Sequence, residues 1–124
     1  MSTLKVATLQ DTSGNNSSTP EQVAQGRAKA WAKFDGTGTV AITDDFNISS
    51  LADNGTGKYT LSFTNAMANT NYCVVTAASS GAQSNVDTWF NPIVFNTGSV
   101  QVAGQNSSSA NVDRTLNNVV VFGD

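Results

Sequence analysis

The first clear pattern in the chain is an alternation of small apolar residues with larger or charged ones between Ala28 and Phe34. Ala and Phe at the even positions alternate with Lys29, Trp31 and Lys33, the period of two that a half-buried β-strand shows. Ala and Lys are also good helix formers, so a helix is the competing interpretation. The glycine-containing turn that follows favours the strand, because it leads into the next apolar segment.

Short segments of the same kind recur along the rest of the chain. Apolar residues alternate with polar ones, or form short runs, over the ranges 40–42, 46–48, 59–63, 72–77, 89–95, 100–102 and 119–122. Turn formers separate these segments, and the strongest turn signal is the Asn-Gly pair within 53–57,. The pattern predicts an all-β fold, an antiparallel β-sandwich or small barrel of about 7–8 short strands.

Two of these segments carry finer predictions. The segment 72–77 is apolar on both faces, so we expect a central strand in which Cys73 is a buried, inert small hydrophobe,. Pro92 interrupts the apolar residues of 89–95, and a proline cannot donate to a sheet ladder,. We therefore expect Pro92 at a sheet edge or at a bulge.

The first 27 residues differ from the rest of the chain. Leu4, Val6 and Leu9 form an apolar strip long enough for one strand, and a run of turn formers follows over 11–20,. Thr19 and Pro20 then have the order typical of a helix cap and first helical position, and Gly26 limits the helix to one or two turns. We expect an extended N-terminal docking arm (residues 1–27) followed by a β-sandwich domain (residues 28–124).

Composition narrows the classes of function. The chain has 124 residues, a net charge of −3, no His and one Cys, which excludes His-dependent catalytic triads and Cys- or His-based metal sites. The acidic balance argues against nucleic-acid binding, and no apolar run is long enough for membrane insertion. The first residues do not resemble a signal peptide, so we expect synthesis in a cytoplasm and release by lysis.

Several stretches resemble phage proteins. The segments 4–6 and 9–15 resemble the opening of many virion structural proteins of marine phages, especially cyanophages, and the segments 26–38, 46–50, 53–63 and 66–72 resemble a module that recurs in phage tail-fibre-like proteins. The resemblance covers roughly residues 4 to 75. It implies a β-rich virion protein of a tail fibre or head appendage that forms a trimer, and it carries over no catalytic residue. Fibre proteins usually carry long shafts, and this chain has none. A small head decoration protein is therefore an alternative interpretation.

Two groups of residues are candidate sites. Trp31 is out of phase with its apolar neighbours, so it projects from the face opposite the core and is a candidate for a subunit interface,. The predicted docking residues are Leu4, Val6, Leu9, Arg27 and Trp31. Aromatic rings stack on sugars and short amides bind them, which makes a second group candidates for facing a receptor: Trp89, Phe90, Asn85 and Asn106. Ordinary core packing of Trp89 and Phe90 is the competing interpretation.

These features predict a non-enzymatic virion structural protein, tail-fibre-like or a surface appendage. Its expected partners are other capsid or tail proteins, two further copies in a homotrimer, and a host-surface glycan as a candidate receptor. The alternatives are a capsid decoration protein that clamps neighbouring subunits and a soluble carbohydrate-binding module. We expect no cofactor or metal, because Asp44 and Asp45 point to opposite strand faces and the turn at 53–55 lacks the further ligands of a calcium loop,. An enzyme using Asp35, Asp87 and Asp113 is the remaining alternative.

Overall fold

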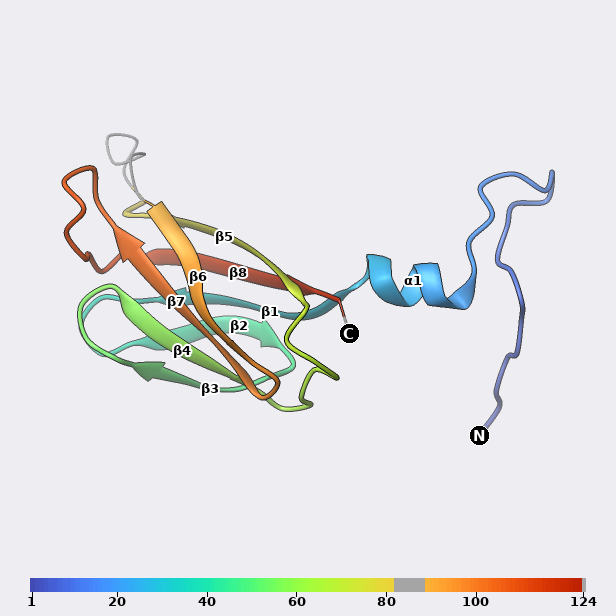
Figure 1. Ribbon diagram of the computed structural model, residues 1–124, viewed down its shortest axis with the longest axis horizontal. Coiled ribbons are helices and arrows are strands. Elements are labelled where there is room, and N and C mark those ends of the chain that lie inside the picture. Colours follow the sequence, from blue (N-terminus) through green and yellow to red (C-terminus); the bar gives the residue numbers. More distant parts are fainter. Residues whose placement is uncertain (82–88, 124) are drawn as a thin grey trace.

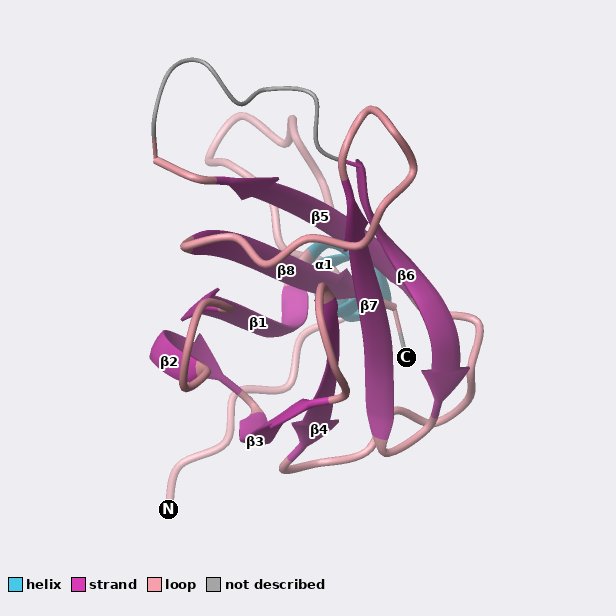
Figure 2. Cartoon of the chain, turned by 90° about the vertical axis from the view of Figure 1, so that its left-hand side faces the viewer, coloured by secondary structure: helices cyan, strands magenta, loops and turns pink. Residues whose placement is uncertain are grey.

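The computed structural model describes residues 1–81 and 89–123. These residues form one short helix and eight strands (Figure 1): α1 (Pro20–Gly26), β1 (Ala28–Asp35), β2 (Ala41–Phe46), β3 (Ile48–Asp53), β4 (Lys58–Phe63), β5 (Cys73–Ser79), β6 (Trp89–Asn96), β7 (Ser99–Gln105) and β8 (Leu116–Phe122). The strands pair antiparallel in two four-stranded sheets, with the orders β2-β1-β8-β5 and β3-β4-β7-β6. Figure 2 shows the sheets as two facing layers, so the predicted antiparallel β-sandwich is confirmed.

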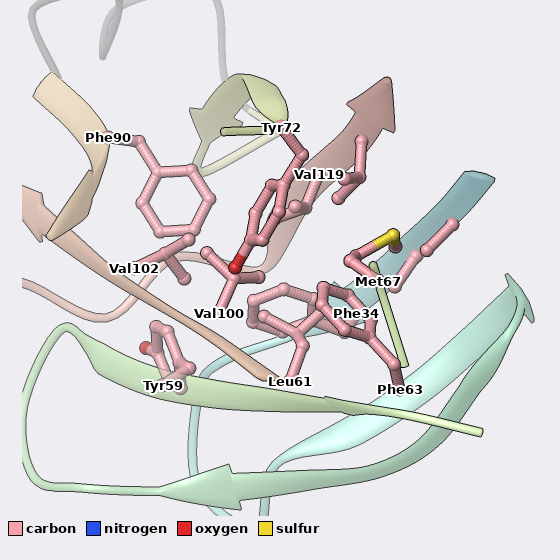
Figure 3. Packing of buried hydrophobic residues seen from close by; sticks show 13 residues of the cluster. Phe34, Tyr59, Leu61, Phe63, Met67, Tyr72, Phe90, Val100, Val102 and Val119 are labelled. Carbon is pink, nitrogen blue, oxygen red and sulfur yellow. The ribbon is translucent and has the colours of Figure 1, made fainter. Parts of the chain in front are cut away.

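The core lies between the two sheets and follows the alternation seen in the sequence. In β1 the side chains of Ala30, Ala32 and Phe34 are only 0–2% exposed, which is why the strand prevails over the competing helix,. The Phe34 ring meets the Tyr59 ring of the facing sheet edge-on, with centroids 5.1 Å apart,. Figure 3 shows the largest members of this core, which include Phe34, Tyr59, Leu61, Phe63, Met67, Tyr72, Phe90, Val100, Val102 and Val119.

The chain passes from one sheet to the other at Asn47, where the sequence predicts a continuous strand over 46–48. β2 ends at Phe46 in one sheet and β3 begins at Ile48 in the other, and Asn47 between them has a φ of 59°. Asn tolerates this left-handed conformation better than most residues. Its Nδ2 donates to the carbonyls of Lys29 (3.0 Å) and Asn65 (3.1 Å), and its Oδ1 accepts from the Asn65 N–H at 2.7 Å. The prediction of a continuous strand over 46–48 was wrong, because the hydrogen bonds of the Asn47 side chain stabilise a bend between the two sheets.

Two predictions about strand position have opposite outcomes. β5 is an edge strand that pairs only with β8 within its sheet, so the central position predicted for 72–77 is wrong. Cys73 is exposed, since one face of this apolar run is open rather than covered. The prediction for Pro92 is confirmed, because β6 is an edge strand and its register with β7 shifts between Pro92 and Val94,.

The arm leaves the sandwich at the start of β1 and extends away from it (Figure 1). As predicted, Thr19 caps α1: its hydroxyl accepts from the Gln22 N–H, and the Gln22 side chain accepts from the Thr19 N–H,. Upstream, Leu9 and Ser18 exchange two backbone hydrogen bonds of 2.8 Å that close a turn. None of residues 1–27 is buried. Within the described residues, no helix has the length and apolar character needed to cross a membrane.

Candidate interaction surfaces

An apolar row crosses the outer face of the β2-β1-β8-β5 sheet. Trp31 pairs with Phe46 of β2 on one side and with Val120 of β8 on the other, and Val120 pairs with Val75 of β5. Residues paired directly across strands point to the same face, and Trp31 and Val120 alternate with the buried residues of β1 and β8. Phe46 is 53% exposed and Val75 is 56% exposed, while Trp31 and Val120 are half-buried. These four residues form the apolar row (Phe46, Trp31, Val120 and Val75) on the solvent-facing side of the sheet.

The residues on either side of the apolar row differ in polarity. In one neighbouring row Lys33 pairs with Asp44 and with Asn118, which supplies a charged rim. On the other side Cys73 pairs with Phe122, which extends the apolar surface toward the end where the arm leaves. An apolar centre with a polar rim is the composition of a protein interface. The outward direction predicted for Trp31 is therefore observed, and its role in an interface stays a prediction.

A hollow lies beside the base of the arm, which we call the arm-base hollow. Its larger part, about 410 Å³, is lined by Lys29, Asn47, Asn65, Ala66, Met67 and Ala68. A smaller part of about 160 Å³ is lined by Arg27, Ala28, Lys29, Phe46, Asn47 and Asn65. The predicted docking residue Arg27 thus borders a concave surface that also reaches the apolar row at Phe46. The sequence predicted no role for Asn47 and Asn65 here, because their amides come together only in the folded chain.

The receptor-facing candidates that the structure describes differ in exposure and in role. Trp89 is 59% exposed at the start of β6, as a receptor-facing residue would be. Phe90 is only 5% exposed and packs near Phe34 in the core, so its candidate role is wrong: it points to the opposite face of the strand from Trp89. Asn106 is half-buried, and its Oδ1 accepts from the N–H groups of Ser108 (2.9 Å) and Ala110 (3.1 Å). Its side chain holds the loop together. Asn85 lies outside the described residues.

Trp89 is the first residue of β6, and the start of β6 and the loop after β7 lie at the end of the sandwich opposite the arm (Figure 1). A buried polar cluster closes this end: the Tyr59 hydroxyl donates to Asp113 (2.7 Å) and to the Gly36 carbonyl (3.1 Å), and the Gly57 N–H also donates to Asp113. Burial, and next the hydrogen bond to Asp113, raise the pKa of Tyr59 well above its ordinary value,. The cluster links the turns that contain Gly36, Gly57 and Asp113.

Two of the acidic residues considered for catalysis, Asp35 and Asp113, accept structural hydrogen bonds. Asp113 bridges Tyr59 and Gly57, and Asp35 accepts from the hydroxyl of Thr37 at 2.6 Å, which lowers the pKa of Asp35. Asp87 lies outside the described residues. Asp53 accepts from the Gly55 N–H within its turn. Over residues 1–81 and 89–123 no cluster of acidic or thiol side chains could hold a metal ion.

Comparisons with protein families, with curated proteins and with solved structures found no match to this chain. Three surfaces of the described residues are candidates for a functional role. These are the exposed arm, the apolar row with the adjoining arm-base hollow, and the opposite end with Trp89. All three are suited to binding other macromolecules.

Proposed function

We propose that this chain is a non-enzymatic structural protein of a phage particle, tail-fibre-like or a surface appendage. The proposal joins the resemblance of residues 4–75 to virion proteins with one structural observation. The arm exposes Leu4 (84%) and Leu9 (59%) at one end of the molecule, and the polar loops lie at the other end (Figure 1). Such a polarity suits a protein that is anchored at one end and binds at the other.

The arm is the anchoring segment in this proposal. Its apolar side chains at positions 4, 6, 9 and 23 all lie in solvent. Burying one such side chain on a partner contributes about 1.5–3 kcal/mol, so together they supply a useful part of a docking free energy. The expected anchor partners are other virion proteins of the capsid or tail.

The opposite end is the adhesive surface. Trp89 presents an exposed aromatic ring, and an aromatic face stacks on the apolar side of a sugar ring. The loop around Asn106 is neutral and rich in Ser, which suits short hydrogen bonds to hydroxyl groups. In a homotrimer three weak contacts to a host-surface glycan would add by multivalency.

A capsid decoration protein is the second candidate. The apolar row favours it, because this surface lies on the side of the sandwich and not at its loop end. A side surface suits contacts with neighbouring subunits of a lattice, while the arm clamps them. In that case Trp89 would bind no host receptor.

Labelling of intact phage particles with gold-tagged antibody against this chain tests the proposal. Gold on the tail or its fibres supports the adhesive role, and mutation of Trp89 should then reduce adsorption to host cells. Gold on the head supports the decoration role. Particles without gold, from a lysate that contains the protein, would overturn the virion proposal and favour the soluble carbohydrate-binding module.

A further inference from the structure

The described strands leave four sheet edges, β2, β5, β3 and β6, and three of these edge strands carry features that block the addition of another strand. β2 has two carboxylates, Asp44 and Asp45, and a register shift against β1. β3 has a register shift near Ile48 and ends at Asp53. β6 contains Pro92 and a register shift. Charges, prolines and bulges are the devices by which natural sheets protect their edges.

β5 has none of these features. Its seven residues, Cys73–Ser79, contain no charged residue and no proline. All seven pair with β8 in an unbroken register, from Cys73 opposite Phe122 to Ser79 opposite Leu116. The strand ends its sheet, so the backbone groups on its open side face away from β8,. The exposed side chain of Val75 lies on this unprotected edge.

The position of β5 is held firmly enough for a strand to add to it. The Thr76 hydroxyl donates to the Phe90 carbonyl of β6, which braces β5 against the facing sheet. The partner residue of Val75 is Val120, which belongs to the apolar row. A strand added to β5 would therefore place its outward side chains next to that row.

The same chain contains an unpartnered segment that matches this edge. Residues 3–8 contain Leu4 and Val6 on one face of an extended strand, with a single charge at Lys5,. Leu4 is 84% exposed and Val6 is also exposed. The segment ends where Leu9 and Ser18 close their turn. It is therefore a free apolar strip of strand length.

The placement of the arm directs this strip to another molecule. Ala28, where the arm joins β1, pairs with Phe122, which also pairs with Cys73, so the arm leaves from the same end of the sheet as the start of β5. α1, whose seven residues span about 10 Å, carries the strip away from its own sandwich (Figure 1). In this structure the strip thus lies away from the β5 edge of its own sandwich (Figure 1).

We propose that residues 3–8 of one copy add as a strand to the open edge of β5 in a second copy of this chain. Leu4 and Val6 would extend the apolar row beyond Val75, and the backbone of the strip would bond to the groups on the open side of β5. A six-residue strand is about 20 Å long, and it covers less than a stable interface of about 1,200–2,000 Å² requires. A stable assembly therefore requires each copy to add its strip to β5 of one neighbour and to bind the strip of another neighbour on its own β5. The proposed trimer allows this arrangement. This inference rests on the proposed role of the arm as a docking segment; it assigns residues 3–8 to a second copy of this chain and leaves the rest of the arm for other virion proteins.

Cys73 makes the inference directly testable, because it is the only cysteine of the chain and lies exposed on β5. A second cysteine is placed singly at each position from 3 to 8 of the full chain, followed by mild oxidation and non-reducing electrophoresis. A disulfide needs Cα atoms about 4.4–6.8 Å apart, and side chains alternate along a strand. We expect intermolecular dimers and trimers at the one position that lies opposite Cys73, with yields at least fivefold above those of the other positions, because the next residues on the same face are about 7–8 Å away.

The controls separate docking from random collision. Cys73→Ser in each variant should abolish the cross-links to β5, and Ser13→Cys, in the turn of the arm, measures the background. Equal yields at all six positions, or yields no higher than that background, would overturn the strand addition. Cross-linking within one chain, seen as a monomer of altered mobility, would overturn docking on a second copy.

A second measurement uses the oligomeric state without cysteines or oxidation. The unmodified chain should associate in a concentration-dependent way by light scattering, and Val75→Lys should weaken this association at least tenfold by placing a charge on the edge. Ser50→Lys on the exposed edge strand β3 is the matched control and should leave association unchanged. A monomeric unmodified chain, or equal association of Val75→Lys, would refute the inference. Either outcome is independent of gold labelling, so the virion proposal stands or fails separately.

Discussion

The arm and the sandwich use the same alternation of apolar and polar residues, with different results. In the sandwich, Phe34 and Leu61 alternate with outward residues and are 0–1% exposed, whereas Leu4 and Val6 of the arm alternate with polar residues and lie in solvent. The difference comes from neighbours: each inward residue of the sandwich faces a second sheet, and the arm faces none. An alternating pattern thus predicts a strand with one apolar face but does not say what covers that face. In the sandwich the facing sheet covers it, whereas in the arm the described residues leave it in solvent.

The largest expected contrast is between truncations of matched apolar side chains. Phe34→Ala removes a ring that packs against Tyr59 and Phe90, and it should lower the free energy of unfolding by about 3–5 kcal/mol. Leu4→Ala in the arm should change it by less than about 0.5 kcal/mol. Urea denaturation at low protein concentration measures both. A large loss with Leu4→Ala would mean that the arm packs on its own sandwich.

Gly57 should be the most sensitive glycine of the sandwich. Its φ is +68°, and a Cβ there would lie 2.6 Å from the Gly104 carbonyl oxygen. Gly57→Ala should destabilise the protein by about 2–3 kcal/mol, since strain at such a position and a backbone clash add together. Gly98→Ala is the control, because a Cβ there has open space. Thermal unfolding of the two variants should therefore differ clearly.

The corner between the sheets gives the next effect. Asn47→Ala removes a side chain with four hydrogen bonds to Lys29 and Asn65 and leaves a Cβ at a φ of 59°. We expect a loss of about 2 kcal/mol. Asn47→Gly removes the same bonds but suits the backbone, so it should lose about 1 kcal/mol less. Equal losses in chemical denaturation would show that the backbone conformation at this corner costs nothing.

The buried tyrosines should make the sandwich, and not the arm, sensitive to alkali. Burial raises the pKa of Tyr59 and of Tyr72 above their ordinary value of 10.0. The folded state therefore holds these protons more tightly than the unfolded chain. Their contribution to stability is complete below the unfolded pKa and is lost as the pH rises through the folded pKa. As the pH rises from about 9 to 12, across and above the unfolded pKa, stability should fall less steeply in Tyr59→Phe than in the unmodified protein.

The smallest effect should come from the cap of α1. Thr19→Ala removes the hydroxyl that accepts from the Gln22 N–H, which costs a helix about 1 kcal/mol. No residue of α1 is buried, so this loss should speed proteolysis of the arm without shifting the unfolding of the sandwich. Thr19→Ser keeps the hydroxyl and is the control. A shift in sandwich unfolding with Thr19→Ala alone would contradict the separation of the two regions.

Local chemistry allowed several elements to be predicted well. The alternation in β1, the Asn-Gly turn before β4, the Thr19 cap and the edge position of Pro92 each depend on a few neighbouring residues, and all are observed. The outward direction of Trp31 follows from the same period of two. By contrast, the apolar row needs the register of four strands, which no single segment of sequence contains.

The errors share one physical cause. Cys73 and Phe90 both lie in apolar surroundings in the sequence, yet one is exposed on an edge and the other is buried in the core. Their environment depends on which strands lie beside them and on which face meets the second sheet. The role of Asn47 was not predicted because it depends on the carbonyls of Lys29 and Asn65, which lie 18 residues before and 18 residues after it in the chain.

By itself the sequence determined the strands, their turns, the capped helix and the free apolar strip, because these depend on spacing and on local backbone preferences. Only the tertiary structure decided which strands form the edges, which apolar residues form a row on the outer face and which turns the Tyr59 cluster joins. Those properties arise from pairing between segments far apart in the chain. That pairing leaves β5 as the edge without a charge, a proline or a register shift.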